Sequence, residues 1–280
     1  MSLLVTLHVF SGRENPRWVL GGDEEKEFRA MLETSAVMPG AAAEAGGLGY
    51  RGFSIEDTSA DTAHRQLWTA AAPEGAHLPL LKGAPELEQY LLDKAKPHIE
   101  EPVASHVAAM LRAGPSPAAA AGPAPVKCPA CVASDAPVYN PAIWNTPQVQ
   151  PHNNCYNYAN NQITNTFAQP GRASGHMYTQ LQCNNVEPAA HSDGLNPSPN
   201  FTGHLASGKG WYVALVMWPN VDYHWYRQDK VGCWSHKPGQ TAARNTDNSG
   251  HAIADPKTCN RGSYTQFCTY MITGRWVHIR

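Results

Sequence analysis

A stretch made almost entirely of alanine, proline and glycine, AGPSPAAAAGPAPVK at residues 113–127, divides this 280-residue chain. Side chains of this kind can build neither an apolar core nor a polar network, so the stretch predicts a semi-extended linker. The sequence therefore predicts a small domain over residues 1–112 and a larger domain over residues 128–280. A surface loop within a single domain is the alternative.

The composition narrows the classes of partner and the location. The formal net charge is −2, so neither a nucleic acid nor a membrane is predicted as a partner. No apolar run approaches the roughly 20 residues of a membrane-spanning helix. The first residues, MSLLVTLHVFSGRENP, lack the basic start and long apolar core of a secretory signal. A cytoplasmic location is therefore predicted, with export by a signal-independent route as the alternative.

Residues 1–112 have the pattern of a small α+β domain of unknown role. Alternating apolar residues predict two strands, at residues 3–10 and 48–56. Amphipathic segments, two of them with proline near the start, predict three helices, at residues 23–33, 85–95 and 101–114. No catalytic group of residues is apparent here, so this domain is expected to dock a partner or to cover the site of the larger domain.

The segment HNNCYNYANNQITNTF, residues 152–167, places one cysteine among asparagines. Asparagine is a good helix N-cap, so a helix is predicted with Cys155 in its first turn. Three apolar residues recur every four positions and predict that this helix continues to Pro170: Ala159, Ile163 and Phe167. A thiol at a helix N-terminus is favoured as the thiolate, which makes Cys155 a candidate nucleophile. A buried structural cysteine or a disulfide is the alternative.

The segment at residues 210–241 predicts an antiparallel meander in which His224 and His236 lie on consecutive strands. If both rings face the helix of Cys155, His224 accepts the thiol proton and His236 orients the His224 ring. Asp222 is expected to be a turn residue. Three alternatives remain: a metal site made of the same three residues, a disulfide at Cys155, and ordinary hairpin histidines.

These three residues carry a resemblance to the NlpC-type papain-like cysteine peptidases, bacterial cell-wall enzymes. ALVMWPNVDYHWYRQDKVGCWSHKPG is similar to that family in its order of strands and turns and in its twelve-residue spacing between histidines. The resemblance covers residues 139–240 and implies an α+β, papain-like domain, in which a helix bearing the cysteine packs on an antiparallel sheet. It implies that Cys155, His224 and His236 form the catalytic triad.

The function predicted from this resemblance is a cysteine-dependent amide hydrolase, a peptidase or amidase. A peptide or peptidoglycan fragment is the expected substrate, and an antibacterial effector the expected setting. Four further residues are predicted to bind the substrate: Asn154, Tyr156, Asn157 and Trp225. No cofactor and no metal are predicted. A papain-like acyltransferase or protein deamidase is one alternative, and a non-catalytic glycan- or peptide-binding protein is another.

All seven cysteines lie in the larger domain. Apart from Cys155 there are six, which can pair in 15 ways, and the sequence does not choose among them: Cys128, Cys131, Cys183, Cys233, Cys259 and Cys268. Disulfides are typical of an oxidising compartment, whereas reduced thiols agree more simply with a cytoplasmic location. CPAC, residues 128–131, has no second ligand pair at zinc spacing, so zinc is not favoured.

Overall fold

The structure, a computed structural model, describes residues 2–35, 47–58, 80–114 and 126–280. The chain forms two compact units, each described here by itself. Unit 1 comprises residues 1–9, 15–46 and 50–117, and unit 2 comprises residues 10–14, 47–49 and 118–280. Residues 115–125, which make up most of the predicted linker, lie outside the described residues.

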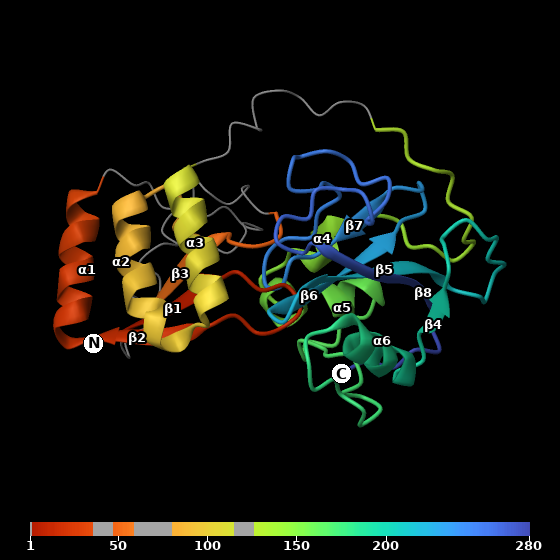
Figure 1. The fold of residues 1–280 in the computed structure, drawn as a ribbon, viewed down its shortest axis with the longest axis horizontal. Coiled ribbons are helices and arrows are strands. Elements are labelled where there is room, and N and C mark those ends of the chain that lie inside the picture. The colour runs from red at the N-terminus through yellow and green to blue at the C-terminus, as the bar shows by residue number, and fades with distance from the viewer. Residues whose placement is uncertain (1, 36–46, 59–79, 115–125) are drawn as a thin grey trace. The chain divides into compact units, whose positions relative to one another are not determined.

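Unit 1 contains a three-stranded antiparallel sheet and helices (Figure 1). The strands, in the order β2-β1-β3, are β1 (Ser2–His8), β2 (Arg17–Gly21) and β3 (Gly52–Asp57). The helices are α1 (Gly22–Thr34), α2 (Pro85–Ala95), the short 3-10 helix η1 (Lys96–His98) and α3 (Glu101–Ala113). Helices α1, α2 and α3 lie side by side, with α2 in the middle.

The core of unit 1 follows the periodicity of its sequence. Leu3, Val5 and Leu7 alternate along the central strand and are fully buried, because successive side chains of a strand point to opposite faces. The three helices agree with their predicted positions to within a residue. Strand β2 was not predicted, because five residues that follow a proline are too short for a clear alternation.

Unit 2 contains a five-stranded antiparallel sheet with strand order β4-β8-β5-β6-β7. The strands are β4 (Asn196–Ser198), β5 (Trp211–Trp218), β6 (Asp222–Gln228), β7 (Trp234–His236) and β8 (Gln266–Thr273). The helices are α4 (Pro141–Trp144), the 3-10 helix η3 (Gln150–His152), α5 (Cys155–Ala159) and α6 (Cys183–Ser192). The protein is therefore α+β, with antiparallel sheets.

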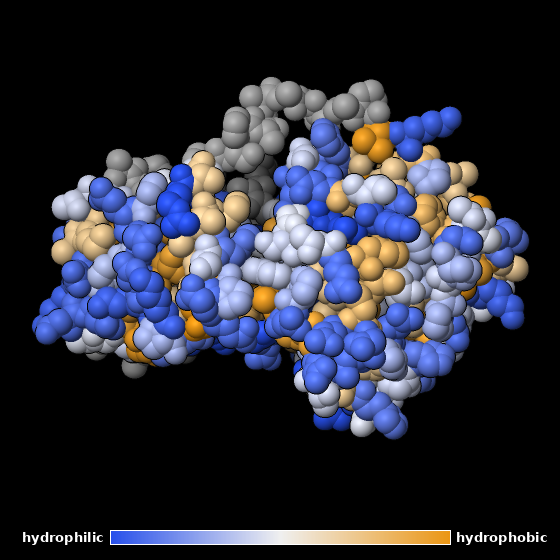
Figure 2. Space-filling model, viewed as in Figure 1, coloured by the Kyte–Doolittle hydropathy of each residue, from blue (hydrophilic) through white to orange (hydrophobic). Residues whose placement is uncertain are grey.

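The main core of unit 2 lies between one face of this sheet and helices α5 and α6. Cys155 of α5 and Val186 of α6 pack with Leu215 of β5 and with Tyr223 and Trp225 of β6. All eight residues of β5 are buried, so both faces of the central strand are covered. At the surface, hydrophilic residues surround small apolar patches (Figure 2).

Helix α5 is much shorter than predicted and ends at Ala159. The residues that were expected to continue it leave the helical region: Asn161, Asn165 and Phe167 all have positive φ. Asn side chains tolerate this backbone conformation, and they compete for backbone hydrogen bonds. Ile163 is 43 % exposed, so the four-residue apolar repeat does not mark a buried helix face.

Two disulfides connect distant parts of unit 2. They join Cys128 to Cys233 and Cys183 to Cys268, across sequence separations of 105 and 85 residues. Cys131, Cys155 and Cys259 are free. The preference for fully reduced thiols is therefore wrong, because four of the seven cysteines lie close enough in pairs to be bonded.

Candidate functional site

The structure brings His224 and His236 together in the interior of unit 2. Nδ1 of His236 lies 2.8 Å from Nε2 of His224, and both residues are fully buried. The register pairs His236 with Tyr226, two residues beyond His224, so the rings meet diagonally across β6 and β7. Nε2 of His236 lies 3.0 Å from the carbonyl oxygen of Thr246. The two rings thus form part of a continuous hydrogen-bonded chain.

Cys155 and the His224 ring lie on opposite faces of the sheet, and Ser11 connects them at the edge. Tyr223 and Trp225 pack with Cys155 in the main core, and His224, which lies between them in β6, points to the opposite face. Residues 222–225 pair with β5 but not with β7, so they form an edge. There the Ser11 hydroxyl hydrogen-bonds both Nδ1 of His224 and the Cys155 thiol.

Asp222 holds the loop that carries Ser11. The backbone N–H groups of Ser11 and Arg13 donate to its carboxylate at 2.5 and 3.1 Å, and that of Gly12 donates at 3.2 Å. The hydroxyl of Tyr264 donates to the same carboxylate. Three consecutive N–H groups directed at one carboxylate resemble the backbone nests that bind anions. Asp222, expected to be a turn residue, is instead the first residue of β6 and is fully buried.

Burial governs the electrostatics of this cluster. Burial first, and the nearby Asp222 carboxylate second, raise the pKa of the Cys155 thiol to about 12. Burial also raises the pKa of Asp222, against the opposing effect of its hydrogen bonds from Tyr264 and the loop. The thiol is therefore held in its neutral form at neutral pH, the opposite of what a helix N-terminus was expected to do.

The four residues predicted to bind substrate all lie inside unit 2, fully buried. Asn154 is the N-cap of α5, and its side chain accepts from the N–H groups of Tyr156 and Asn157. Asn157 completes a capping box and also accepts from the N–H of Ala168 at 2.9 Å. The hydroxyl of Tyr156 donates to Asp193, and Trp225 packs in the core. Their visible contacts are internal ones.

Lys237, next to His236, is another buried polar group of this interior. Its ammonium donates to the carbonyl oxygens of Gln150, Asn153 and Gly239 at 2.6, 2.6 and 2.7 Å. These bonds connect the segment that follows β7 to the segment that precedes α5. A buried ammonium needs such partners because desolvation without them is costly.

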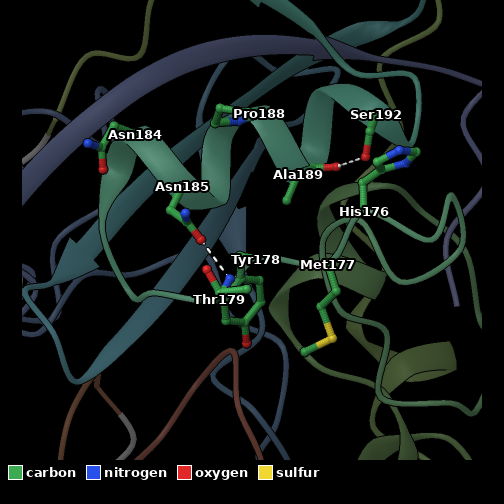
Figure 3. Close-up of a pocket in the computed structure, with 9 residues that line it drawn as sticks. All are labelled: His176, Met177, Tyr178, Thr179, Asn184, Asn185, Pro188, Ala189 and Ser192. Atoms are coloured by element: carbon green, nitrogen blue, oxygen red, sulfur yellow. Dashed lines mark hydrogen bonds between the residues drawn. The ribbon is translucent and has the colours of Figure 1, made fainter.

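The described residues also form a shallow pocket of about 360 Å³ beside α6 (Figure 3). Asn185 and Ala189 of the helix point toward the segment that contains His176 and Thr179. The Asn185 side chain accepts from the backbone N–H of Thr179 at 2.7 Å. The lining combines apolar side chains, such as Met177 and Ala189, with uncharged polar ones, and no motif in the sequence indicates a pocket here.

No resident metal is indicated by the described part of the chain. Among those residues, no group of three or more His, Cys, Asp and Glu side chains is arranged to hold a metal ion. Within the same residues, no helix combines the length and apolarity needed to cross a bilayer.

Ser11 and Asp222 are the two members of the cluster whose roles the sequence did not indicate. They lie 211 residues apart, and the loop motif SGRENP resembles any turn-rich connection. The buried state of Asp222 could have been suspected from its place between two apolar strands, but its partners could not.

Unit 2 is thus an α+β domain with two disulfides. In its interior, hydrogen bonds connect Cys155, His224, His236 and Asp222 through Ser11. No family model matches the chain, and no solved structure matches it. A curated protein does: insoluble matrix shell protein 1 of Ruditapes philippinarum is 49 % identical over 138 residues. The match covers 49 % of this chain and 89 % of that protein. The chain belongs to the family of this shell matrix protein.

Family membership overturns the predicted activity. A relative named for an insoluble shell matrix indicates a structural protein, so the predicted cysteine peptidase or amidase acting on peptidoglycan is wrong. The description as a hydrolase is wrong for the same reason. The alternatives of acyl transfer, deamidation and glycan or peptide binding gain no support. The predicted cytoplasmic location is also wrong, because a matrix protein works outside the cytoplasm.

Proposed function

We propose that this protein is a structural component of an insoluble extracellular matrix. The observation that carries the proposal is its 49 % identity to a shell matrix protein over 89 % of that protein's length. Two disulfides with long sequence separations agree with work in an oxidising compartment, where such bonds persist.

The buried cluster suits this role because it acts as internal bracing. Ser11, His224 and His236 form a hydrogen-bonded chain in a region from which solvent is excluded. Buried polar networks that are well satisfied rigidify a domain and favour one arrangement of its core. A matrix component benefits from such rigidity, since it must keep its shape without turnover.

We further propose that residues 128–280 retain a papain-like scaffold of the NlpC type, used here as a structural module. Its support is the arrangement of Cys155 at the start of α5, packed on an antiparallel sheet whose successive strands carry His224 and His236. An experimental structure that aligned with NlpC-type domains through α5 and β5–β7 would support this scaffold. A different connection of those elements would exclude it.

Fractionation tests the structural role. The tagged full chain, produced in its source organism, is expected in the extracellular residue that resists detergent and chaotrope. A Cys155→Ser variant is the matched control, because the proposed role needs a folded core but no chemistry of the Cys155 thiol. It should enter the same residue in the same amount. Recovery of the chain in the soluble cytosol would contradict the proposal.

Alkylation of the native protein tests the role of the buried cluster separately. Because Cys155 is fully buried and its pKa is raised to about 12, iodoacetamide should modify it only after unfolding. The half-buried Cys131 provides the internal reference. Modification of Cys155 before Cys131 in the native protein would show that the cluster is open to solvent and would contradict the bracing role.

A further inference from the structure

Three cysteines of unit 2 that do not belong to the buried cluster lie close together. Cys128 and Cys233 are bonded, with their Cα atoms 5.0 Å apart, and Cys131 is free only three residues from Cys128. All three residues are half-buried rather than enclosed. A free thiol and a disulfide that are both reachable from solvent are the two reactants of thiol–disulfide exchange.

The backbone holds these cysteines against the turn between β6 and β7. A Cβ atom added to Gly232 would lie 1.8 Å from the carbonyl oxygen of Pro129 and 3.0 Å from the backbone nitrogen of Cys131. The CPAC segment therefore lies in direct contact with the residue before Cys233. Gly232 also has φ of +92°, a conformation that glycine adopts most readily.

Hydrogen bonds fix the chain on the other side of Cys131. The N–H of Leu205 donates to Val132, and the N–H of Ser134 donates to Leu205, each at 2.9 Å. The Cys131 thiol donates to the carbonyl oxygen of Ala133 at 3.6 Å. The thiol also donates to Oε1 of Gln228 at 3.9 Å, and the half-buried side chain packs partly against the main core. Cys131 is thus held on an anchored segment, beside a disulfide.

The other two free thiols are in a different situation. Cys155 is fully buried, and burial raises its pKa to about 12. Burial likewise raises the pKa of Cys259 to about 12, and its sulfur lies 4.0 Å from the hydroxyl of Tyr226. Since the thiolate is the reacting form, these two cysteines are poor nucleophiles at neutral pH.

We propose that Cys128, Cys131 and Cys233 form a thiol–disulfide exchange site that joins copies of this chain covalently. The inference rests on the proposed matrix function, because it supplies a mechanism of insolubility. The Cys131 thiolate of one copy attacks a sulfur of the Cys128–Cys233 disulfide of a second copy. That disulfide breaks, a disulfide between the copies forms, and the departing sulfur takes up the proton that Cys131 lost.

This reaction needs no oxidant, because one disulfide replaces another. The thiol that is released on the second copy can attack a third, so the linkage can propagate through an assembly. An odd cysteine left over in a disulfide-bonded protein outside the cell is a recognised source of pairing between chains. The seven cysteines of this chain leave such a remainder.

The surface around the site favours a second copy as the partner. Val126, Val138 and Val231 are 37, 69 and 72 % exposed. Val126 lies two residues before Cys128, and Val231 lies two before Cys233. Val138 follows Pro137, whose carbonyl oxygen accepts from Lys230 in the same turn. Contact between these valine side chains of two copies removes them from water. A net charge of −2 gives little electrostatic repulsion between the copies.

Cross-linking of the full chain tests the exchange. Isotope-labelled and unlabelled copies, purified with their disulfides, are mixed without oxidant under argon at mildly alkaline pH and quenched with iodoacetamide. Non-reducing gels should show covalent oligomers. Mass spectrometry should find peptides from different copies that join Cys131 to Cys128 or to Cys233. Cys131→Ser should slow oligomer formation at least about tenfold, whereas the control Cys259→Ser should leave it unchanged.

The outcomes separate this inference from the proposed function. Oligomers that form equally fast in Cys131→Ser, or that are linked through other cysteines, would overturn the exchange site. So would a wild-type chain that stays monomeric while its Cys131 is open to alkylation. A Cys131→Ser chain that still enters the insoluble residue would overturn the exchange mechanism and leave the matrix function standing. A chain that cross-links through Cys131 but is recovered in the soluble cytosol would overturn the matrix function and leave the exchange site standing.

Discussion

The interactions that stabilise unit 1 differ in kind from those that stabilise unit 2. Unit 1 contains no cysteine, and alternating or helical apolar patterns account for its sheet and helices. Unit 2 depends on two disulfides and on asparagine, aspartate and lysine side chains that hydrogen-bond the backbone of distant segments. Apolar burial therefore accounts for most of unit 1, whereas unit 2 also depends on covalent and polar links between segments that are distant in the sequence.

The difference is one of which interactions resist unfolding. Apolar burial is non-directional and is spread over many contacts in a core. A disulfide or a buried lysine acts between two particular segments, so its loss frees both at once. Hydrogen exchange measured on the intact chain can follow each unit separately and can test this contrast.

Reduction should have the largest effect and should fall on unit 2 alone. Closing loops of 105 and 85 residues is expected to contribute about 4 kcal/mol each to the free energy of unfolding, by loop-closure entropy. Dithiothreitol should therefore raise the exchange of unit 2 amides strongly and leave unit 1 unchanged. The double variant Cys183→Ala with Cys268→Ala should give about half of the effect. Equal loss of protection in both units would refute the contrast.

Removal of the buried lysine should be the next largest perturbation. Lys237→Met keeps the length of the side chain but leaves the carbonyl oxygens of Gln150, Asn153 and Gly239 without this donor. The expected loss is about 4 kcal/mol in the unfolding free energy of unit 2, since each buried acceptor left unsatisfied costs about 1–3 kcal/mol. Denaturant titration measures it. Lys209→Met, at an exposed position, is the control and should change little.

Acid should act on unit 1 through His8. Burial, with the nearby positive charges of Arg51 and Arg17, lowers the pKa of His8 from 6.5 to about 3. Between pH 6.5 and pH 3, His8 binds a proton in the unfolded chain but not in the folded unit. The free energy of unfolding therefore decreases as the pH falls toward 3. The loss between pH 6.5 and pH 4 should reach about 3 kcal/mol, at about 1.4 kcal/mol per pH unit.

The variant His8→Gln checks this assignment. Glutamine can donate to or accept from the Ser54 hydroxyl, which lies 2.8 Å from Nε2 of His8, but it does not titrate. Its unit 1 should show a flatter dependence of hydrogen exchange on pH than the wild type, after correction for the intrinsic exchange rate. An unchanged slope would mean that another group is responsible.

The smallest of these effects should come from the asparagine that holds the loop after α5. Asn157→Ala removes half of the capping box and the contacts of this side chain with Gln162, Thr164 and Ala168. The expected cost is about 2 kcal/mol. Differential scanning calorimetry should detect a lower Tm for unit 2. Asn184→Ala, at an exposed position of α6, should stay within about 0.5 kcal/mol of the wild type.

Sequence reasoning succeeded where local pattern decides the structure. The helices of unit 1 and the meander from β5 to β7 follow from periodicity and turn residues, and the hairpin spacing anticipated that His224 and His236 meet. It failed for the length of α5. The apolar repeat predicted a longer helix, but asparagine side chains compete for the backbone hydrogen bonds and favour a loop instead.

The candidate site exposes a second limit. The family resemblance drew attention to Cys155 and the histidines, but not to Ser11, whose hydroxyl hydrogen-bonds both the thiol and His224. Nothing in a single sequence pairs a serine near the start with a strand that follows more than two hundred residues later. The burial that keeps the thiol neutral depends on such contacts, so its chemistry could not be deduced from its neighbours alone.

The bonds between the Ser11–Arg13 backbone and Asp222 also have a consequence for synthesis. Their donors leave the ribosome about two hundred residues before their acceptor, at 211, 210 and 209 positions of separation. The Ser11–Arg13 backbone cannot form these bonds until most of the polypeptide has been made. Contacts between residues so far apart in the sequence also form slowly. Pairing of the strand that carries Asp222 and docking of the Ser11–Arg13 loop should therefore be among the last events in the folding of unit 2.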